Sequence, residues 1–423
     1  MTKEGIASFL ILYLIQTLQL SDAQAYAFVG LKEVVSYIIP FLAAILVSSF
    51  VSAAQGALMG MVLMGLGCFT LALPSIEALN IGFGFFLFGY GLGKPTFPLL
   101  VAMKHDLDRE EKDTRIRYLY TFGNTAAFIA PFLMGLLGGI KTWHYSFNVL
   151  GSLCLLGSVL SYVILKQENL LQHTLFHDIT LKKGIAFLIL PFIFSLPFFF
   201  PVLKTVFLVG SGVWVLMFFY RSWQKFTLEE KDLFKKLLMI FGSIIIFFAF
   251  QTLEYTLFPV YVERFIDRTL FSYEIKTPWF HMVAPLLSII AAPLLIKLFH
   301  QHKTHTNNLI IKKINISFLV VFLSYSGMYL STFLSDKSLY MILLSYGLFF
   351  VGGFLLIPTS QEIMSRFKSN KTKRILMGIL FLTMACARLI GSLLGQKFGE
   401  NLSFNTMSMS AFEHSFRYIL FIV

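Results

Sequence analysis

Long apolar runs follow one another along almost the whole chain, and they restrict its possible folds more than any other feature. A run of about 20 apolar residues is the length that crosses the hydrocarbon core of a membrane as a helix. The runs fall at 5–20, 29–53, 57–76, 79–103, 117–139, 146–165, 184–203, 205–220, 236–261, 278–299, 314–334, 339–362, 375–396 and 412–423. With 57% hydrophobic and 13% charged residues, the chain is also far more apolar than a soluble domain. We therefore expect an all-α polytopic membrane protein of about 14 transmembrane helices, the first and last of them short.

The loops that carry most of the lysines and arginines predict the orientation. These loops lie at 104–117, 166–183, 221–236, 297–313 and 366–374, and all fall on one side of the membrane. The positive-inside rule makes that side cytoplasmic, and it places the N-terminus there too. The charged runs from Asp106 to Arg117 and from Glu229 to Lys236 are then expected to be solvated cytoplasmic loops. The net charge of +12 needs no nucleic-acid partner to explain it.

Several kinds of site are not expected. Cys68, Cys154 and Cys386 lie inside apolar runs without the spacing of metal ligands, which argues against disulfides and metal sites. The run at 5–20 lacks the basic region and cleavage site of a signal peptide, so it is interpreted as a first span. No His/Asp or Ser/His constellation stands at membrane depth. We therefore expect neither an enzyme nor a bound cofactor.

The order of the runs suggests three parts. Six runs within 1–165 are followed by a stretch at 166–235 that contains a basic linker and a tight pair of runs, and six more lie in 236–423. Two six-helix halves with a substrate site at the membrane midplane are the plan of the major facilitator transporters. The extra pair between the halves narrows the choice further.

Lys94 is the most unusual residue in these runs, because it lies well inside the run at 79–103. An ammonium costs a few kcal/mol to place in a membrane, so it usually faces a partner or a water-filled cavity. Snorkelling to the membrane surface is the alternative, but a further apolar stretch follows Lys94. Gly89, Gly91 and Gly93 precede it, and these small residues suit either close helix packing or bending.

The motifs around Lys94 and later in the chain resemble the proton-dependent oligopeptide transporter family, in its bacterial form with two additional central helices. Gly91-Leu-Gly-Lys-Pro95 resembles the glycine-rich element of the family's helix four, and Tyr120 with Asn124 resembles its helix-five signature. Further matches in family order are Leu10–Leu14, Tyr37–Pro40, Trp143–Phe147, Thr277–Phe280 and Ile357–Thr359. The resemblance covers nearly the whole chain and implies a bacterial inner-membrane protein.

The resemblance also implies a substrate site. In this family the helix-four lysine, here Lys94, binds the peptide carboxylate and takes part in proton coupling. The positions of Tyr120 and Asn124 hydrogen-bond the peptide, and Tyr37 and Tyr90 are further candidates of the same kind. Interhelical hydrogen bonding is the alternative role for Tyr120 and Asn124. The expected partners are a small peptide, protons and the lipid bilayer.

The N-terminal part departs from the family pattern. The family's helix-one Glu-x-x-Glu-Arg element, which partners the lysine, is not found before Glu4, and a start upstream of Met1 would restore it. We expect Glu33, beside Lys32, to compensate Lys94 instead. Glu33 and Lys94 are therefore candidates for proton coupling.

The second half departs further. Thr252 and Leu253 stand at the family's helix-seven glutamate and glutamine, so their neighbours Gln251 and Glu254 are possible substitutes. Glu254, a third proton-coupling candidate, is expected about one turn from the outer end of its helix, where it is either functional or solvated. Gly353 replaces an acid expected to bind a peptide amine. Arg388 is a new buried cation without an assigned partner.

Three functions remain open at this stage. The first is proton-coupled symport of di- and tripeptides by alternating access. The second is a divergent carrier of another small carboxylate-bearing solute without proton coupling. The third is a non-transporting relative.

Overall fold

Helices make up nearly all of the chain that the computed structural model describes. The description covers residues 2–422 except 51, 103–108, 139–141, 168–180, most of 201–225, 271, 288–306, 334–338, 368–369 and 401–408. The helices before the middle of the chain are α1 (Thr2–Gln16), α2 (Asp22–Phe50), α3 (Ala53–Leu71), α4 (Ile76–Ala102), α5 (Arg109–Leu137), α6 (Trp143–Gln167) and α7 (Leu181–Phe199). After it come α9 (Leu228–Phe265), β1 (Thr269–Leu270), β2 (Tyr273–Glu274), the 3-10 helix η1 (Thr277–Met282), α11 (Asn307–Ser331), α12 (Leu339–Ser365), α13 (Asn370–Glu400) and α14 (Met409–Ile422).

The predicted all-α membrane architecture is confirmed. Each predicted apolar run has a helix at its place, apart from those at 205–220 and 278–299, which lie largely outside the described residues. Six of the described helices are long and apolar enough to cross a membrane, and three further apolar helical stretches are shorter. The first and last helices are short, as expected, with 15 and 14 residues. At about 1.5 Å per residue, neither reaches across a core of about 30 Å.

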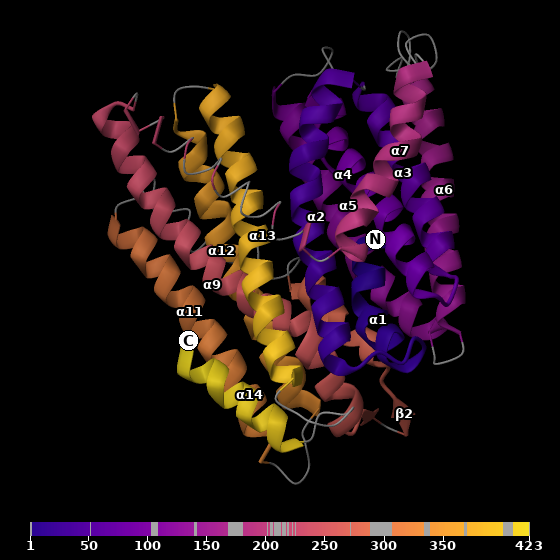
Figure 1. Ribbon diagram of the computed structural model, residues 1–423. Coiled ribbons are helices and arrows are strands. Elements are labelled where there is room, and N and C mark those ends of the chain that lie inside the picture. Colours follow the sequence, from indigo (N-terminus) through magenta and orange to yellow (C-terminus); the bar gives the residue numbers. More distant parts are fainter. Residues whose placement is uncertain are drawn as a thin grey trace.

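The helices form two groups, which Figure 1 shows side by side. One group holds α1 to α6, and the other holds α9 and α11 to α13. Helix α7 lies against the first group, where Phe83 and Phe198 stack at 5.7 Å and Phe88 and Phe194 at 5.1 Å. Helix α6 ends at Gln167 and α9 begins at Leu228, so both lie close to the predicted boundaries at 165 and 236. The division into three parts stays a prediction.

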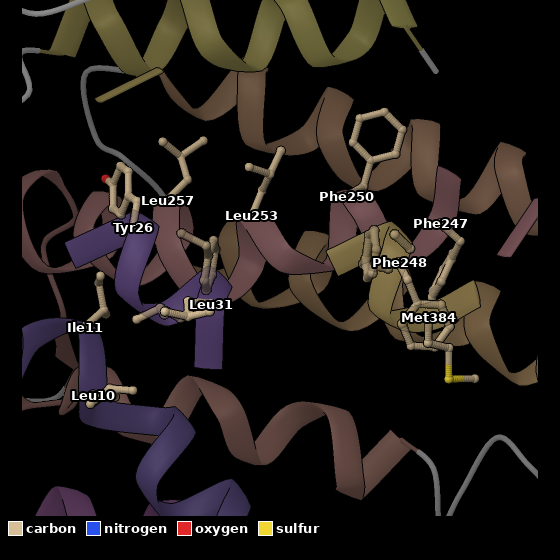
Figure 2. Packing of buried hydrophobic residues seen from close by; sticks show 14 of the residues in the cluster. Leu10, Ile11, Tyr26, Leu31, Phe247, Phe248, Phe250, Leu253, Leu257 and Met384 are labelled. Atoms are coloured by element: carbon tan, nitrogen blue, oxygen red, sulfur yellow. The ribbon is translucent and has the colours of Figure 1, made fainter. Parts of the chain in front are cut away.

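A continuous apolar core joins the two groups. Side chains of α1 and α2, such as Leu10 and Tyr26, belong to the same buried cluster as Phe250 and Leu253 of α9 and Met384 of α13 (Figure 2). The groups also come together at the lower end of Figure 1, near β2. We call this the hairpin end, after the two-stranded antiparallel sheet of β1 and β2.

The glycines before Lys94 serve close packing in this structure. A Cβ atom on Gly60 of α3 would lie 2.7 Å from the Gly89 carbonyl oxygen and 2.9 Å from the Gly93 nitrogen of α4. A Cβ on Gly91 would meet Ile39 of α2. Because these glycines have no side chains, the backbone of α4 can lie close to α2 and α3.

The prediction that the charged runs are loops was wrong where the structure describes them. Residues 109–117 form the first turns of α5. Residues 229–236 form the first turns of α9, which begins with a capping box. In this box the Thr227 hydroxyl accepts a hydrogen bond from the Glu230 backbone N–H at 3.3 Å, and a Glu230 carboxylate oxygen accepts one from the Thr227 N–H at 3.2 Å. Such reciprocal bonds satisfy free donors at a helix start, so charged residues there continue the helix.

Candidate functional site

Lys94 lies between the two helix groups with its ammonium against aromatic rings. Its Nζ atom is 5.4 Å from the ring centre of Tyr90, 5.8 Å from that of Tyr37 and 5.2 Å from that of Phe381. These rings come from α4, α2 and α13, so the side chain points toward the facing half and not toward lipid. The side chain is exposed, and within the described part of the chain it pairs with no carboxylate. The electron-rich faces of these rings therefore stabilise its positive charge, and the ammonium is available to bind an anion.

Glu33 does not compensate Lys94 as expected, because it is surrounded by three other cations. Its carboxylate lies 2.5 Å from Lys32 Nζ, 3.9 Å from Lys3 Nζ and 3.9 Å from Arg388 Nε. All four side chains are largely buried. A buried carboxylate is stabilised by neighbouring cations that replace its lost hydration. Glu33 thus balances charge contributed by α1, α2 and α13 together.

Arg388 is deeply buried, with 2% of its surface exposed. One guanidinium nitrogen donates a hydrogen bond of 2.5 Å to the Gln251 side-chain oxygen of α9. Its carbon atom Cζ lies 5.6 Å from the ring centre of Tyr37, 5.1 Å from that of Phe248 and 5.3 Å from that of Tyr255. Its Nε and Nη1 atoms have no hydrogen-bond partner among the described residues. Within the described structure, Nη1 of Arg388 is therefore a free donor at the contact between the two halves, while Nε faces the Glu33 carboxylate at 3.9 Å without a hydrogen bond.

Glu254 is buried, with 1% of its surface exposed, and neither of its carboxylate oxygens has a hydrogen-bond partner in the described structure. The expectation that it lies one turn from the helix end was wrong, because α9 continues to Phe265. The hydroxyls of two neighbouring tyrosines are engaged elsewhere. Tyr325 donates to the Phe250 carbonyl oxygen at 3.0 Å, and the Tyr346 hydroxyl lies 2.9 Å from His281 Nδ1.

The remaining predicted site residues are less well defined. Tyr120 lies in α5, but its side chain falls outside the described part. Asn124, also in α5, is half-buried, and no hydrogen bond joins it to the described residues around Lys94. Gly353 faces Phe247, whose ring lies 3.0 Å from the position of an added Cβ. No group of three His, Cys, Asp or Glu side chains among the described residues could hold a metal ion.

Sequence reasoning missed two parts of this site. Lys3 was not considered, although its Nζ lies 5.0 Å from the Tyr37 ring centre and 5.5 Å from that of Tyr90. Arg388 was noticed, but its contacts with Glu33 and Gln251 were not foreseen. The available signal was that charges in apolar runs tend to pair with one another. Applied to Lys32, Glu33 and Arg388, that rule would have indicated the cluster, whereas Lys3 precedes the first apolar run and gave no such signal.

Charged side chains also join the two groups at the hairpin end. Two Arg264 nitrogens at the end of α9 donate hydrogen bonds of 2.6 and 2.8 Å to the two Asp22 carboxylate oxygens at the start of α2. Nearby, Gln16 of α1 donates to Glu263 of α9 at 3.4 Å. Trp279 of η1 donates to the Phe132 carbonyl oxygen of α5 at 3.1 Å. Hydrogen bonds and an ion pair therefore connect the two halves at this end.

Comparisons with known proteins agree with the fold. A family model described as Major Facilitator Superfamily matches residues 1–392. The chain is 21% identical over 365 residues to the uncharacterized transporter YclF of Bacillus subtilis (strain 168), covering 81% of this chain and 73% of that relative. It is 19% identical over 405 residues to a di-/tripeptide transporter of Lactococcus lactis subsp. cremoris, covering 89% of this chain and 80% of that relative.

Solved structures of peptide transporters have the same fold. A POT family transporter in complex with 5-aminolevulinic acid superposes with a TM-score of 0.81 at 19% identity, over 100% of this chain and 91% of the other. A mutant of the peptide transporter POT in complex with alafosfalin gives a TM-score of 0.79 at 22% identity, over 100% and 89% of the two chains. The family resemblance and the fold class expected from the sequence are therefore confirmed.

Proposed function

Because this chain belongs to the Major Facilitator Superfamily, we propose that it is a secondary active transporter that imports di- and tripeptides together with protons by alternating access. The names of the Lactococcus lactis relatives, called di-/tripeptide transporters, support this substrate class. The observation that carries the proposal is Lys94, an exposed cation between the halves that pairs with no carboxylate of the described chain. A substrate carboxylate supplies the missing anion.

In this proposal the peptide lies between Lys94 and the residues of α2, α4 and α5 around it. Tyr37 and Tyr90 already flank the ammonium, and their hydroxyls are suited to hydrogen-bond a peptide backbone. Tyr120 and Asn124 of α5 supply a further phenol and amide. Near a protein surface a carboxylate and an ammonium attract each other more strongly than they do in bulk water.

The proton is carried by Glu254 in this proposal. Glu33 is surrounded by three cations, which keep its charged form favourable. The Glu254 carboxylate accepts no hydrogen bond from the described residues, so burying it in ionised form is costly. A proton on Glu254 therefore favours this arrangement of the halves, and loss of the proton favours another. Lys94 contributes by binding or releasing the substrate.

The hairpin end is the outer side in this proposal, and the N-terminus is cytoplasmic in a bacterial inner membrane. The Asp22–Arg264 pair then holds the outer side closed. The two halves, divided at 165 and 236, rock about the site to open each side in turn.

A carrier of another small carboxylate-bearing solute without proton coupling is the second candidate. The absence of an acid at Gly353 favours this candidate. The neighbour of Gly353 is the ring of Phe247, which offers no negative charge to a peptide amine. A non-transporting relative is the third. Uptake assays with a labelled dipeptide and with another labelled small carboxylate separate the three. The first candidate takes up the dipeptide with protons, the second takes up the other carboxylate, and the third takes up neither.

The test is Lys94→Ala in proteoliposomes with a labelled dipeptide. We expect uptake to fall by about tenfold to a hundredfold, the effect of losing one hydrogen bond to a charged group. The matched control is Lys312→Ala, which removes an exposed lysine of α11. Uptake by Lys94→Ala at the level of the control would refute the proposed role of Lys94.

A further inference from the structure

Between the two halves, positively charged side chains outnumber the carboxylates that pair with them. Lys3, Lys32 and Arg388 all reach the same carboxylate, that of Glu33. The other acids nearby, Glu4 and Glu254, form no ion pair with any described residue. One negative charge is thus shared among three cations, and Lys94 adds a fourth. Buried charges need partners, so the arrangement favours an incoming anion.

Arg388 shows where such an anion would bind. Its Nε and Nη1 atoms are buried donors without a hydrogen-bond partner among the described residues. Almost all buried donors in proteins are satisfied, so each exception needs an explanation. Guanidinium is the side-chain group best suited to carboxylates, because its planar array of donors matches two oxygens. The three rings around the guanidinium restrict its movement, so that it is preorganised to bind an anion.

Tyr37 lies near both Arg388 and Lys94, the proposed binding site of the substrate carboxylate. Its ring centre lies 5.8 Å from Lys94 Nζ and 5.6 Å from Arg388 Cζ. The two cations are therefore at most about 11 Å apart. Two residues of extended chain span about 7 Å, and a hydrogen bond of about 2.9 Å at each end lets a solute of dipeptide length reach both.

From these observations we infer that the preferred solute carries an anionic group at each end, one bound by Lys94 and the other by Arg388. Such a solute is a dipeptide-sized dicarboxylate, in which an acyl group with a terminal carboxylate replaces the free amine. A free amine would meet the Arg388 guanidinium, a like charge. This inference rests on the proposed transport function, but it replaces the free dipeptide by a dipeptide-sized solute of the carboxylate-bearing class named as the second candidate.

The test compares three solutes of similar size on the full-length wild-type protein. These are N-succinyl-alanine with two carboxylates, N-acetyl-alanine with one, and the zwitterion alanyl-alanine. Binding is measured by calorimetry in detergent, and uptake is measured in proteoliposomes. We expect N-succinyl-alanine to bind about tenfold more tightly than either other solute, the effect of one added charged hydrogen bond.

Variants then assign the preference to Arg388. Arg388→Gln should remove the advantage of N-succinyl-alanine while leaving the binding of N-acetyl-alanine within about twofold. The control is Lys397→Gln, which removes an exposed cation from the same helix. Because Arg388→Gln alters a buried cluster, Arg388→Lys serves as a second variant and should keep part of the advantage.

The outcomes separate the two proposals. Equal or weaker binding of N-succinyl-alanine to the wild type overturns the inference, whatever the variants do. If alanyl-alanine is then bound and taken up in a manner dependent on Lys94, the transport proposal stands alone. If none of the three solutes is bound or taken up, both proposals fail.

Discussion

At the level of single residues, Glu33 and Glu254 are buried carboxylates in opposite surroundings. Glu33 lies within 4 Å of three cations, at 2.5, 3.9 and 3.9 Å. Glu254 has no hydrogen-bond partner for either oxygen within the described structure. Removing charge therefore has opposite consequences at the two sites. Neutralising Glu33 would leave buried cations unpaired, whereas neutralising Glu254 would remove an unpaired charge.

This contrast leads to a prediction for Glu254→Gln. The amide resembles a permanently protonated carboxyl, so the variant should fold and bind substrate but should no longer respond to protons. We expect exchange of labelled for unlabelled dipeptide across proteoliposome membranes to continue, while an inward pH gradient no longer accelerates uptake. Glu229→Gln, an exposed position on the same helix, should respond to the gradient like the wild type. Gradient-driven uptake by Glu254→Gln would exclude Glu254 as the proton carrier.

The sequence predicted individual site residues better than it predicted their partners. Lys94 could be singled out because an ammonium inside an apolar run is costly wherever the helices pack. Its neighbours could not, because Tyr37, Tyr90 and Phe381 come together only when α2, α4 and α13 meet. The pairing of Glu33 with Arg388 spans the two halves for the same reason.

At the level of elements, α3 and α4 depend on glycines for their contact. We predict that Gly60→Ala destabilises the protein, because the added Cβ would lie 2.7 Å from a backbone oxygen of α4. Overpacking of this kind costs about 1–3 kcal/mol and should lower the melting temperature in detergent. The control is Gly242→Ala in α9, where an added Cβ has no neighbour within 4 Å. That change should be neutral or stabilising by up to about 1 kcal/mol. Equal melting temperatures for the two variants would contradict the packing argument.

The positions of the helices were largely predictable, because a membrane requires long apolar runs with internally satisfied backbones. The residues at which the helices begin and end were harder to predict. Helix α9 begins at Leu228 through its capping box and continues past the apolar run to Phe265, where Arg264 pairs with Asp22. Hydropathy alone stops at the last apolar residue, whereas a cap or a distant ion pair extends a helix into charged sequence. This is why Glu254 was expected near a helix end and is instead deep within the helix.

At the level of the whole molecule, the two halves are joined at the hairpin end by the Asp22–Arg264 pair. The pair has two hydrogen bonds, of 2.6 and 2.8 Å, and the Asp22 side chain is buried. Alternating access requires this end to open. Every interaction that joins the halves here therefore favours the state closed at the hairpin end, and its loss should favour the open state.

We predict that Asp22→Asn shifts the molecule toward the state open at the hairpin end. Hydrogen bonds to charged groups contribute about 1.5–3 kcal/mol, so the ratio of the two states should change by about tenfold or more. Spin labels at the exposed positions Leu73 and Phe333, one in each half, would report longer distances in the variant by double electron–electron resonance. The exchanged pair Asp22→Arg with Arg264→Asp should restore the wild-type distances, since the ion pair is re-formed with its ends reversed. An unchanged distance distribution in Asp22→Asn would mean that the other contacts at this end, between Gln16 and Glu263 and between Trp279 and Phe132, keep it closed without help from the ion pair.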